Sequence, residues 1–209
     1  MLGFSKIKIG IINLKSHNLF SILQAMKNIG YKTKIVENYK EIIKTDMIIL
    51  PGVGSFKYAM NYLNKTGLKD ELLKHTSIKR KSLFGICLGM QLLFTKSEEF
   101  GKTKGLNLFQ GKVKKINTNN KKVPHIGWNN IKKKNRFFLP KKVLTKKFYF
   151  THSFYCEPKN INDIHTETKY DNLIFCSSVI KENIIGTQFH PEKSGEAGLT
   201  ILKEIKNIL

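Results

Sequence analysis

The stretch Ser82-Leu83-Phe84-Gly85-Ile86-Cys87-Leu88-Gly89 carries an apolar run to a cysteine that stands between two glycines. Apolar residues then continue at helical spacing through Leu88, Leu92 and Leu93. This is the Gly-x-nucleophile-x-Gly elbow, a strand-to-helix turn so tight that side chains at the glycine positions would collide with neighbouring backbone. The N-terminus of the following helix favours a thiolate over a thiol. A core cysteine between two incidental glycines is the alternative, and the pentapeptide alone does not decide between the two.

A second segment, Gly186-Thr187-Gln188-Phe189-His190-Pro191-Glu192, contains the groups that a thiol nucleophile requires. His190 follows an apolar strand pattern over residues 183–189, so we expect it at the end of a strand. A thiol needs a base to activate it, and the base needs an acid that holds its tautomer and stabilises the imidazolium. The two segments together therefore predict a catalytic triad of Cys87, His190 and Glu192.

Length and composition predict one soluble domain that spans residues 1–209. No apolar run approaches the ~20 residues that a membrane span needs, and the N-terminus lacks the pattern of a signal peptide. The three cysteines, Cys87, Cys156 and Cys176, form no Cys-x-x-Cys pair, which argues against a disulfide framework or a zinc site. We therefore expect a protein of the reducing cytoplasm.

The formal net charge of +22 invites a nucleic-acid interpretation. Arg80 and Arg136 are the only arginines among the 37 basic residues, however, and base readout relies on arginine forks. Lysine runs such as Lys132-Lys133-Lys134 are most simply solvated loop surface. We therefore expect neither nucleic acid nor membrane among the partners.

Strand and helix patterns alternate through the first half of the chain. The apolar spacing predicts strands over residues 6–12, 31–37, 47–50 and 82–86, and helices over 18–29, 56–63, 68–77 and after Cys87. This alternation predicts an α/β fold with a mostly parallel sheet that is flanked by helices. Such sheets place their sites at the carboxyl ends of strands, where Pro51, Cys87 and His190 all fall.

The pattern changes to short strands and turns between residue 105 and about residue 185. Strand patterns there include residues 111–116, 148–150 and 173–179. We expect a largely antiparallel insertion beside the main sheet, followed by a closing helix at about 196–208.

The chain as a whole resembles the class I (triad-type) glutamine amidotransferases and, within them, the glutaminase subunits of imidazole glycerol phosphate synthases. The elbow and the His-Pro-Glu segment mark the superfamily. The segments Pro51-Gly52-Val53-Gly54 and Pro124-His125-Ile126-Gly127-Trp128-Asn129 are more specific to these subunits. The resemblance implies a flavodoxin-like sheet and hydrolysis of glutamine to glutamate and ammonia, a reaction that needs neither a metal nor an organic cofactor. It also implies a heterodimer with a (β/α)8-barrel cyclase subunit, which would use the ammonia to form imidazole glycerol phosphate and aminoimidazole carboxamide ribotide in histidine biosynthesis.

The tetrahedral oxyanion of amide hydrolysis needs preorganised hydrogen-bond donors. We expect one from the backbone N–H of Leu88, the residue after the nucleophile. The other is expected from the loop that contains Gly52 and Val53. The resemblance implies that the peptide between these two residues reorients under the control of the partner subunit.

Further residues are assigned to the substrate and to the partner. Gln91 lies one helical turn after Cys87 and faces the same way, so it is a candidate to hydrogen-bond glutamine. Glu99 is a candidate for the substrate ammonium group, and by resemblance Ser153 and Phe154 supply backbone contacts to the substrate. His152 is interpreted as structural. The resemblance implies a partner interface at Asn18, Pro124, His125, Trp128, Asn129 and Lys193.

One segment departs from the family pattern. Related chains carry Asp-Tyr-Gly-x-Gly-Asn after the first strand, whereas this chain has Asn13-Leu14-Lys15-Ser16-His17-Asn18. Lys15 and His17 replace glycines in a region that is expected to face the partner. Two alternatives therefore stay open: a paralogous glutaminase subunit that feeds ammonia to another synthase, such as a surface-sugar amidotransferase, and a free-standing Cys-His-Glu hydrolase.

Overall fold

The structure is a computed structural model that describes residues 7–15, 18–135 and 140–205. Its centre is an array of neighbouring strands in the order β2-β1-β3-β4-β14. These strands are β1 (Ile9–Ile12), β2 (Thr33–Val36), β3 (Met47–Leu50), β4 (Ser82–Ile86) and β14 (Ile184–Thr187). Each pairing within the array is parallel, so the carboxyl ends of these strands lie along one edge.

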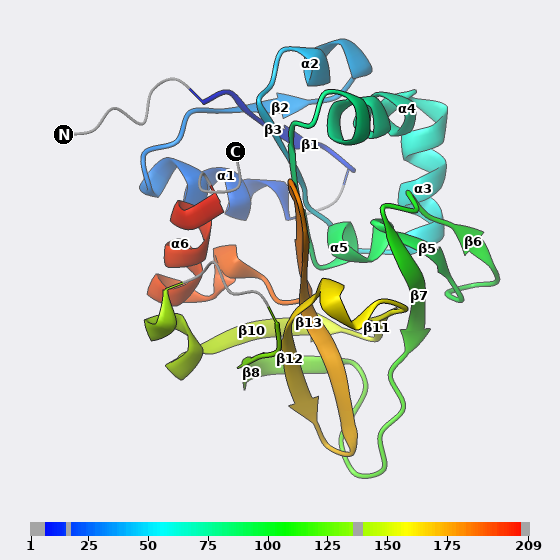
Figure 1. Ribbon diagram of the computed structural model, residues 1–209, viewed down its shortest axis with the longest axis vertical. Coiled ribbons are helices and arrows are strands. Elements are labelled where there is room, and N and C mark those ends of the chain that lie inside the picture. The colour runs from blue at the N-terminus through cyan, green and yellow to red at the C-terminus, as the bar shows by residue number, and fades with distance from the viewer. Residues whose placement is uncertain (1–6, 16–17, 136–139, 206–209) are drawn as a thin grey trace.

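Helices cover both faces of the parallel array (Figure 1). The helices on one face are α1 (Leu19–Asn28) and α6 (Gly195–Glu204), and those on the other are α3 (Phe56–Lys65), α4 (Leu68–Leu73) and α5 (Leu88–Leu92). Side chains alternate between the two faces of a strand, so neighbours in β3 enter different cores. Ile49 packs in the cluster that contains α1, whereas Ile48 packs in the cluster that contains α3. The parallel array is therefore buried on both faces, which is why its strands read as continuous apolar runs.

The predicted antiparallel strands of the second half are present, but they continue the main sheet. The pairing of β13 with β14 is antiparallel and joins them to the parallel array. The strands of this region are β5 (Phe94–Ser97), β6 (Thr103–Lys104), β7 (Phe109–Lys115), β9 (Lys132–Lys133), β11 (Phe154–Pro158), β12 (Ile164–Tyr170) and β13 (Leu173–Lys181). A separate antiparallel pair, β8 (His125–Asn130) with β10 (Lys147–His152), lies below β1, β2 and β3 in Figure 1, at the height of β12 and β13.

The structure differs from the sequence prediction in several helices. The helix expected over 68–77 is α4 followed by a π-helical turn, η1 (Lys74–Ile78). A short helix, α2 (Tyr39–Ile43), was not predicted, although Asn38 and Glu41 form the capping box that starts it. Three 3₁₀ turns complete the helical elements of the described residues: η2 (Lys141–Thr145), η3 (Ile161–Asp163) and η4 (Pro191–Lys193). Residue 6 of the first predicted strand and residues 206–208 of the last predicted helix lie outside the described residues.

The elbow between β4 and α5 is sterically constrained as its two glycines predict. A Cβ at Gly85 would stand 2.8 Å from the backbone of Gly89, and a Cβ at Gly89 would stand 1.7 Å from the carbonyl oxygen of Leu50. Cys87 has a φ of 53° and a ψ of −107°, a strained conformation for a residue with a side chain. The helix therefore begins in direct contact with the end of β3, the neighbouring strand.

We predict that Gly89→Ala destabilises the protein by about 3 kcal/mol, the upper end of the usual cost of overpacking, because the new Cβ overlaps backbone that cannot move away as a flexible side chain would. Gly101→Ala is the control: Gly101 has a φ of 96° and open space around its Cβ position. The free energy of unfolding of Gly101→Ala should fall by only ~1–2 kcal/mol, the cost of placing a residue with a side chain in the left-handed region. Urea unfolding of both variants checks this, and equal losses would contradict the steric account of the elbow.

Candidate active site

Three strand ends meet at one place because β3, β4 and β14 are neighbours in the sheet. Pro51 follows β3, Cys87 follows β4, and His190 lies just beyond β14. A cavity of about 560 Å³ opens beside Cys87 at this edge. Its lining residues are Val53, Gly54, Cys87, Leu88, Gln91, Glu99, Phe100, Lys115, Pro124, Thr151, His152, Ser153 and Phe154.

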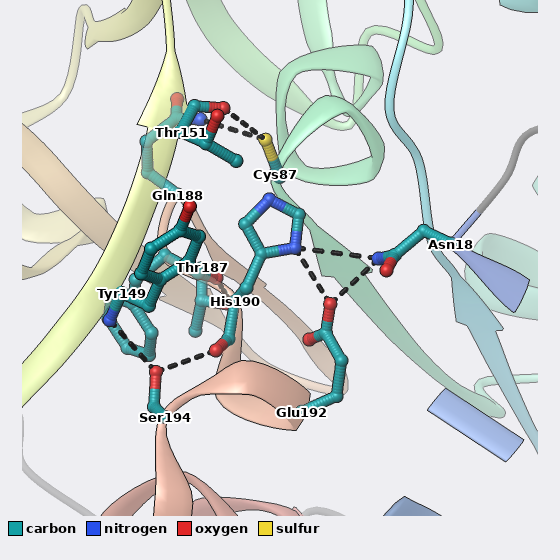
Figure 2. Close-up of polar contacts among 10 residues, drawn as sticks. Asn18, Cys87, Tyr149, Thr151, Thr187, Gln188, His190, Glu192 and Ser194 are labelled. Atoms are coloured by element: carbon teal, nitrogen blue, oxygen red, sulfur yellow. Dashed lines mark hydrogen bonds and ion pairs between the residues drawn. The ribbon is translucent and has the colours of Figure 1, made fainter. Parts of the chain in front are cut away.

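Cys87, His190 and Glu192 lie together, with the histidine between the other two (Figure 2). Nδ1 of His190 is 2.7 Å from Oε1 of Glu192, and both side chains are fully buried. A carboxylate accepts, so Nδ1 carries the proton of a neutral imidazole and Nε2 is left as an acceptor. Nε2 is directed toward the sulfur of Cys87 in Figure 2. The arrangement suits proton transfer between sulfur and Nε2.

Electrostatics in this buried group favour a protonated imidazole. Burial lowers the pKa of His190, but the Cys87 thiolate and the Glu192 carboxylate outweigh burial and raise this pKa to about 10. Burial likewise raises the pKa of Glu192, but its hydrogen bond to His190, the charge of His190 and the hydrogen bond from Asn18 lower it below its usual value. Glu192 is therefore ionised at neutral pH, and it stabilises the imidazolium that forms when Cys87 gives up its proton.

Asn18 also belongs to this buried group, although the family resemblance implied only a place at the partner interface. Its side chain is 3% exposed, and Nδ2 donates to Oε1 of Glu192 at 2.7 Å. Asn18 stands at the N-cap of α1, yet its side chain makes no capping hydrogen bond, because it turns to the carboxylate. The sequence did not predict this contact, because it joins residues 174 positions apart and no local pattern indicates it.

The two N–H groups expected to bind the oxyanion lie in neighbouring segments, but in this conformation neither is available to it. The backbone N–H of Leu88 donates to the carbonyl oxygen of Gly52 at 3.4 Å. The peptide between Gly52 and Val53 therefore presents its oxygen, rather than its N–H, to the position where an oxyanion would form. Gly52 itself has no room for a Cβ, which would stand 2.8 Å from Cβ of Leu88. In this conformation one donor of the oxyanion hole is engaged and the other faces away.

All four residues expected at the substrate line the cavity beside Cys87: Gln91, Glu99, Ser153 and Phe154. The side chain of Gln91 is 6% exposed, and Nε2 donates to the carbonyl oxygen of Phe154 at 2.9 Å. Oε2 of Glu99 accepts from the backbone N–H of Phe56 at 2.6 Å, so this carboxylate also holds the first residue of α3. Glu99 is half-buried.

The residues expected at a partner interface divide into two groups. Pro124, Trp128 and Lys193 are exposed, and Trp128 shows 55% of its surface. Asn129 is half-buried and donates to the carbonyl oxygen of Lys169. His125 is only 2% exposed and stacks on Tyr170 with 3.9 Å between ring centroids, so its side chain faces the interior rather than the surface. The cause is the alternation of strand β8, which sends Trp128 outward and His125 inward.

The segment that departs from the family pattern keeps a glycine-like backbone. Lys15 has a φ of 57°, in the left-handed region that glycine enters most easily. Its backbone N–H donates to Oδ1 of Asn13, and its ammonium group lies 2.7 Å from Glu37. Local hydrogen bonding therefore allows a lysine at this position. His17, the second replacement, lies outside the described residues.

Further features of the described residues lie outside this site. A second cavity, of about 530 Å³, lies at the opposite edge of the sheet, where Ile9, Thr33 and Lys44 contribute to its lining. No group of three or more His, Cys, Asp or Glu side chains in the described part of the chain is arranged to hold a metal ion. None of the helices that the structure describes is long and apolar enough to cross a membrane.

Comparisons with known proteins agree with this geometry. The family model "Glutamine amidotransferase class-I" matches residues 11–206. The imidazole glycerol phosphate synthase subunit HisH of Caldanaerobacter subterraneus subsp. tengcongensis is 44% identical over 202 residues, which cover 96% of this chain and 98% of the relative. The subunit of the same description from Bacillus mycoides is 42% identical over 202 residues, which cover 96% and 95%.

Solved structures confirm the predicted fold class. A crystal structure of a glutamine amidotransferase has a TM-score of 0.72 at 15% identity, covering 96% of this chain and 97% of that chain. The structure of PurLQS from Thermotoga maritima has a TM-score of 0.72 at 18% identity, covering 97% and 98%. At such low identity these two likenesses speak for the fold alone.

We predict that a thiol-alkylating reagent at neutral pH modifies Cys87 and spares Cys156 and Cys176. Cys87 lines the open cavity and faces a base, whereas burial raises the pKa of the other two thiols and keeps them protonated. Peptide mass spectrometry after iodoacetamide treatment of the folded protein checks this. Modification of Cys156 or Cys176 ahead of Cys87 would remove the support for Cys87 as the nucleophile.

Proposed function

Since the chain belongs to the class I glutamine amidotransferases and, within them, to the family of the imidazole glycerol phosphate synthase subunits HisH, we propose that Cys87, His190 and Glu192 carry out its glutaminase reaction. The observation that carries this assignment is the buried contact between Nδ1 of His190 and Glu192. It fixes the tautomer that directs the basic Nε2 toward the sulfur.

The reaction follows from this geometry. The sulfur of Cys87 attacks the side-chain carbonyl carbon of glutamine while the proton resides on Nε2 of His190. The resulting tetrahedral intermediate collapses, its carbon–nitrogen bond breaks, and the imidazolium gives its proton to the departing ammonia. Water then attacks the glutamyl thioester, with His190 as the base. Breaking the carbon–sulfur bond releases glutamate and restores the thiolate–imidazolium pair.

The substrate fits the cavity beside Cys87. The half-buried carboxylate of Glu99 offers a counter-charge to the ammonium group of glutamine, and Lys115 in the same lining offers one to its α-carboxylate. Ser153 and Phe154 bring strand backbone to the cavity wall, where it can pair with the polar end of an amino acid. A cavity of about 560 Å³ is large enough for a glutamine molecule.

The loop after β3 acts as a brake on this reaction. As long as the Gly52 carbonyl oxygen accepts the hydrogen bond of the Leu88 N–H, an oxyanion formed at Cys87 has no preorganised hydrogen-bond donors. Rotation of the peptide between Gly52 and Val53 would withdraw the carbonyl, free the Leu88 N–H and present the Val53 N–H. Gly54, with a φ of 115° and open space around it, gives the loop the freedom to make this change.

The partner is proposed to be a (β/α)8-barrel cyclase that receives the ammonia in histidine biosynthesis. Pro124 belongs both to the cavity lining and to the exposed segment that leads into β8, and Ile126 and Trp128 extend this apolar face on the same strand. A partner bound there would cover the entrance of the cavity and keep ammonia from the solvent. The relatives are described as synthase subunits, which favours this assignment over a free-standing hydrolase and over a paralogue for another synthase.

Replacing the nucleophile tests the reaction itself. Cys87→Ala should abolish glutamine hydrolysis, because no thioester can form. The complex with the cyclase subunit should still make its products from added ammonium salt, since that chemistry belongs to the other subunit. Measured turnover with glutamine and with ammonia separates the two, and residual glutamine-dependent turnover in Cys87→Ala would place the nucleophile elsewhere.

Partner binding should release the brake. We predict that the isolated chain hydrolyses glutamine slowly and that the liganded barrel subunit raises turnover by at least about 10²-fold, the scale of one oxyanion donor. Trp128 fluorescence provides the control, because this exposed side chain should become buried on association whether or not activation follows. Full activity of the isolated chain would argue against the brake and for the free-standing hydrolase.

A further inference from the structure

A buried amide that has been given no role so far touches the nucleophile. Gln188 lies just beyond the end of β14 and is 0% exposed. Its Nε2 is 3.5 Å from Sγ of Cys87, and Figure 2 shows this contact on the side of the sulfur away from the histidine ring. A fully buried polar side chain normally has both ends of its amide satisfied, so the direction of this contact can be worked out from its other partner.

The surrounding hydrogen bonds fix which end of the amide faces sulfur. Nε2 of Gln91 donates to the carbonyl oxygen of Phe154, which can only accept, so the orientation of the Gln91 amide is determined. The same Nε2 also donates to Oε1 of Gln188 at 3.1 Å. Gln188 must therefore turn its oxygen to Gln91 and its NH₂ group to Cys87.

The Phe154 carbonyl that starts this chain is itself held in place. Nδ1 of His152 donates to it at 2.8 Å. Burial lowers the pKa of His152 to about 3, so this imidazole is neutral and its other nitrogen accepts from Nδ1 of His125 at 3.1 Å. The Phe154 carbonyl oxygen therefore accepts a hydrogen bond from His152 and another from Gln91, and neither can reverse its direction.

We propose that Gln188 is a positioning residue that donates a hydrogen bond to the sulfur of Cys87 and stabilises its thiolate for attack. This inference rests on the proposed function only for the identity of the nucleophile. The other contact of the sulfur is the carbonyl oxygen of Thr151 at 3.9 Å, which can accept from a thiol but cannot stabilise a thiolate. Gln188 thus supplies an uncharged hydrogen-bond donor to the Cys87 thiolate, whose negative charge is balanced by the imidazolium of His190.

Other charged and titratable groups act on the same sulfur and must be held constant in a test. His190, paired with Glu192, faces it from the turn after β14, and Cys156 interacts with it electrostatically from β11. Glu99, which follows β5, and Lys115, the last residue of β7, line the same cavity. None of these groups is removed by a substitution at position 188.

The test is the pH dependence of Cys87 alkylation by iodoacetamide, which needs a thiolate but no glutaminase activity. In Gln188→Leu the midpoint of the rate profile should move upward by about one pH unit, and the rate below the midpoint should fall about tenfold. This is the scale of one hydrogen bond to a charged group. Thr187→Val is the matched control: it removes a buried hydroxyl one residue away, which bonds to the carbonyl oxygen of Phe189 and not to the sulfur. Its profile should coincide with that of the parent.

Coincident profiles of Gln188→Leu and the parent would overturn the proposal. Because Gln188→Leu removes a buried amide and could fail to fold, a second measurement uses the unchanged protein. The side-chain NH₂ signals of Gln188 in a ¹⁵N-resolved NMR titration should shift with the same midpoint as the alkylation profile, and signals that ignore this midpoint would also overturn it. Failure of glutamine hydrolysis would reject the proposed function but would leave both readouts intact.

Discussion

The structure depends on a steric constraint between the ends of two neighbouring strands. A side chain at position 89 would clash with the Leu50 carbonyl, and one at position 52 would clash with the Leu88 side chain. The start of α5 is therefore pressed onto the loop that follows β3. This contact places the Leu88 N–H within reach of the Gly52 oxygen. The packing at this edge is what brings the loop after β3 to the residue that follows the nucleophile, and the proposed brake depends on it.

Polar groups of the site are oriented by what lies behind them. Asn18 holds Glu192, Glu192 fixes the tautomer of His190, and Gln91 turns the amide of Gln188 toward Cys87. Each of these groups is buried, so an unpaired donor or acceptor would be costly and the arrangement resists rotation. The consequence is a sulfur with a base on one side and a neutral donor on the other, held ready before the substrate arrives.

Much of this could be predicted from residues whose chemistry shows in the sequence. The two glycines around Cys87 and the spacing of His190 and Glu192 predicted where the three side chains would meet, because parallel strands bring their carboxyl ends together. Contacts that join distant positions left no such signal: Asn18 with Glu192, and Gln188 with Cys87, depend on tertiary packing alone. His125 was assigned to the partner together with its whole segment, by resemblance alone. Alternation along β8 separates it from Trp128, but apolar residues at 126 and 128 would have predicted the opposite orientation, because here they are the exposed ones.

The account's central claim is that the Gly52 carbonyl closes the oxyanion hole and must leave before the chain can work. A crystal structure tests this most directly, with an electrophilic glutamine analogue trapped on Cys87 in the complex with the liganded barrel subunit. The account predicts that the peptide between Gly52 and Val53 has rotated, so that the N–H groups of Val53 and Leu88 both bind the oxygen of the adduct. A trapped adduct in which the Gly52 oxygen still accepts from the Leu88 N–H would contradict it.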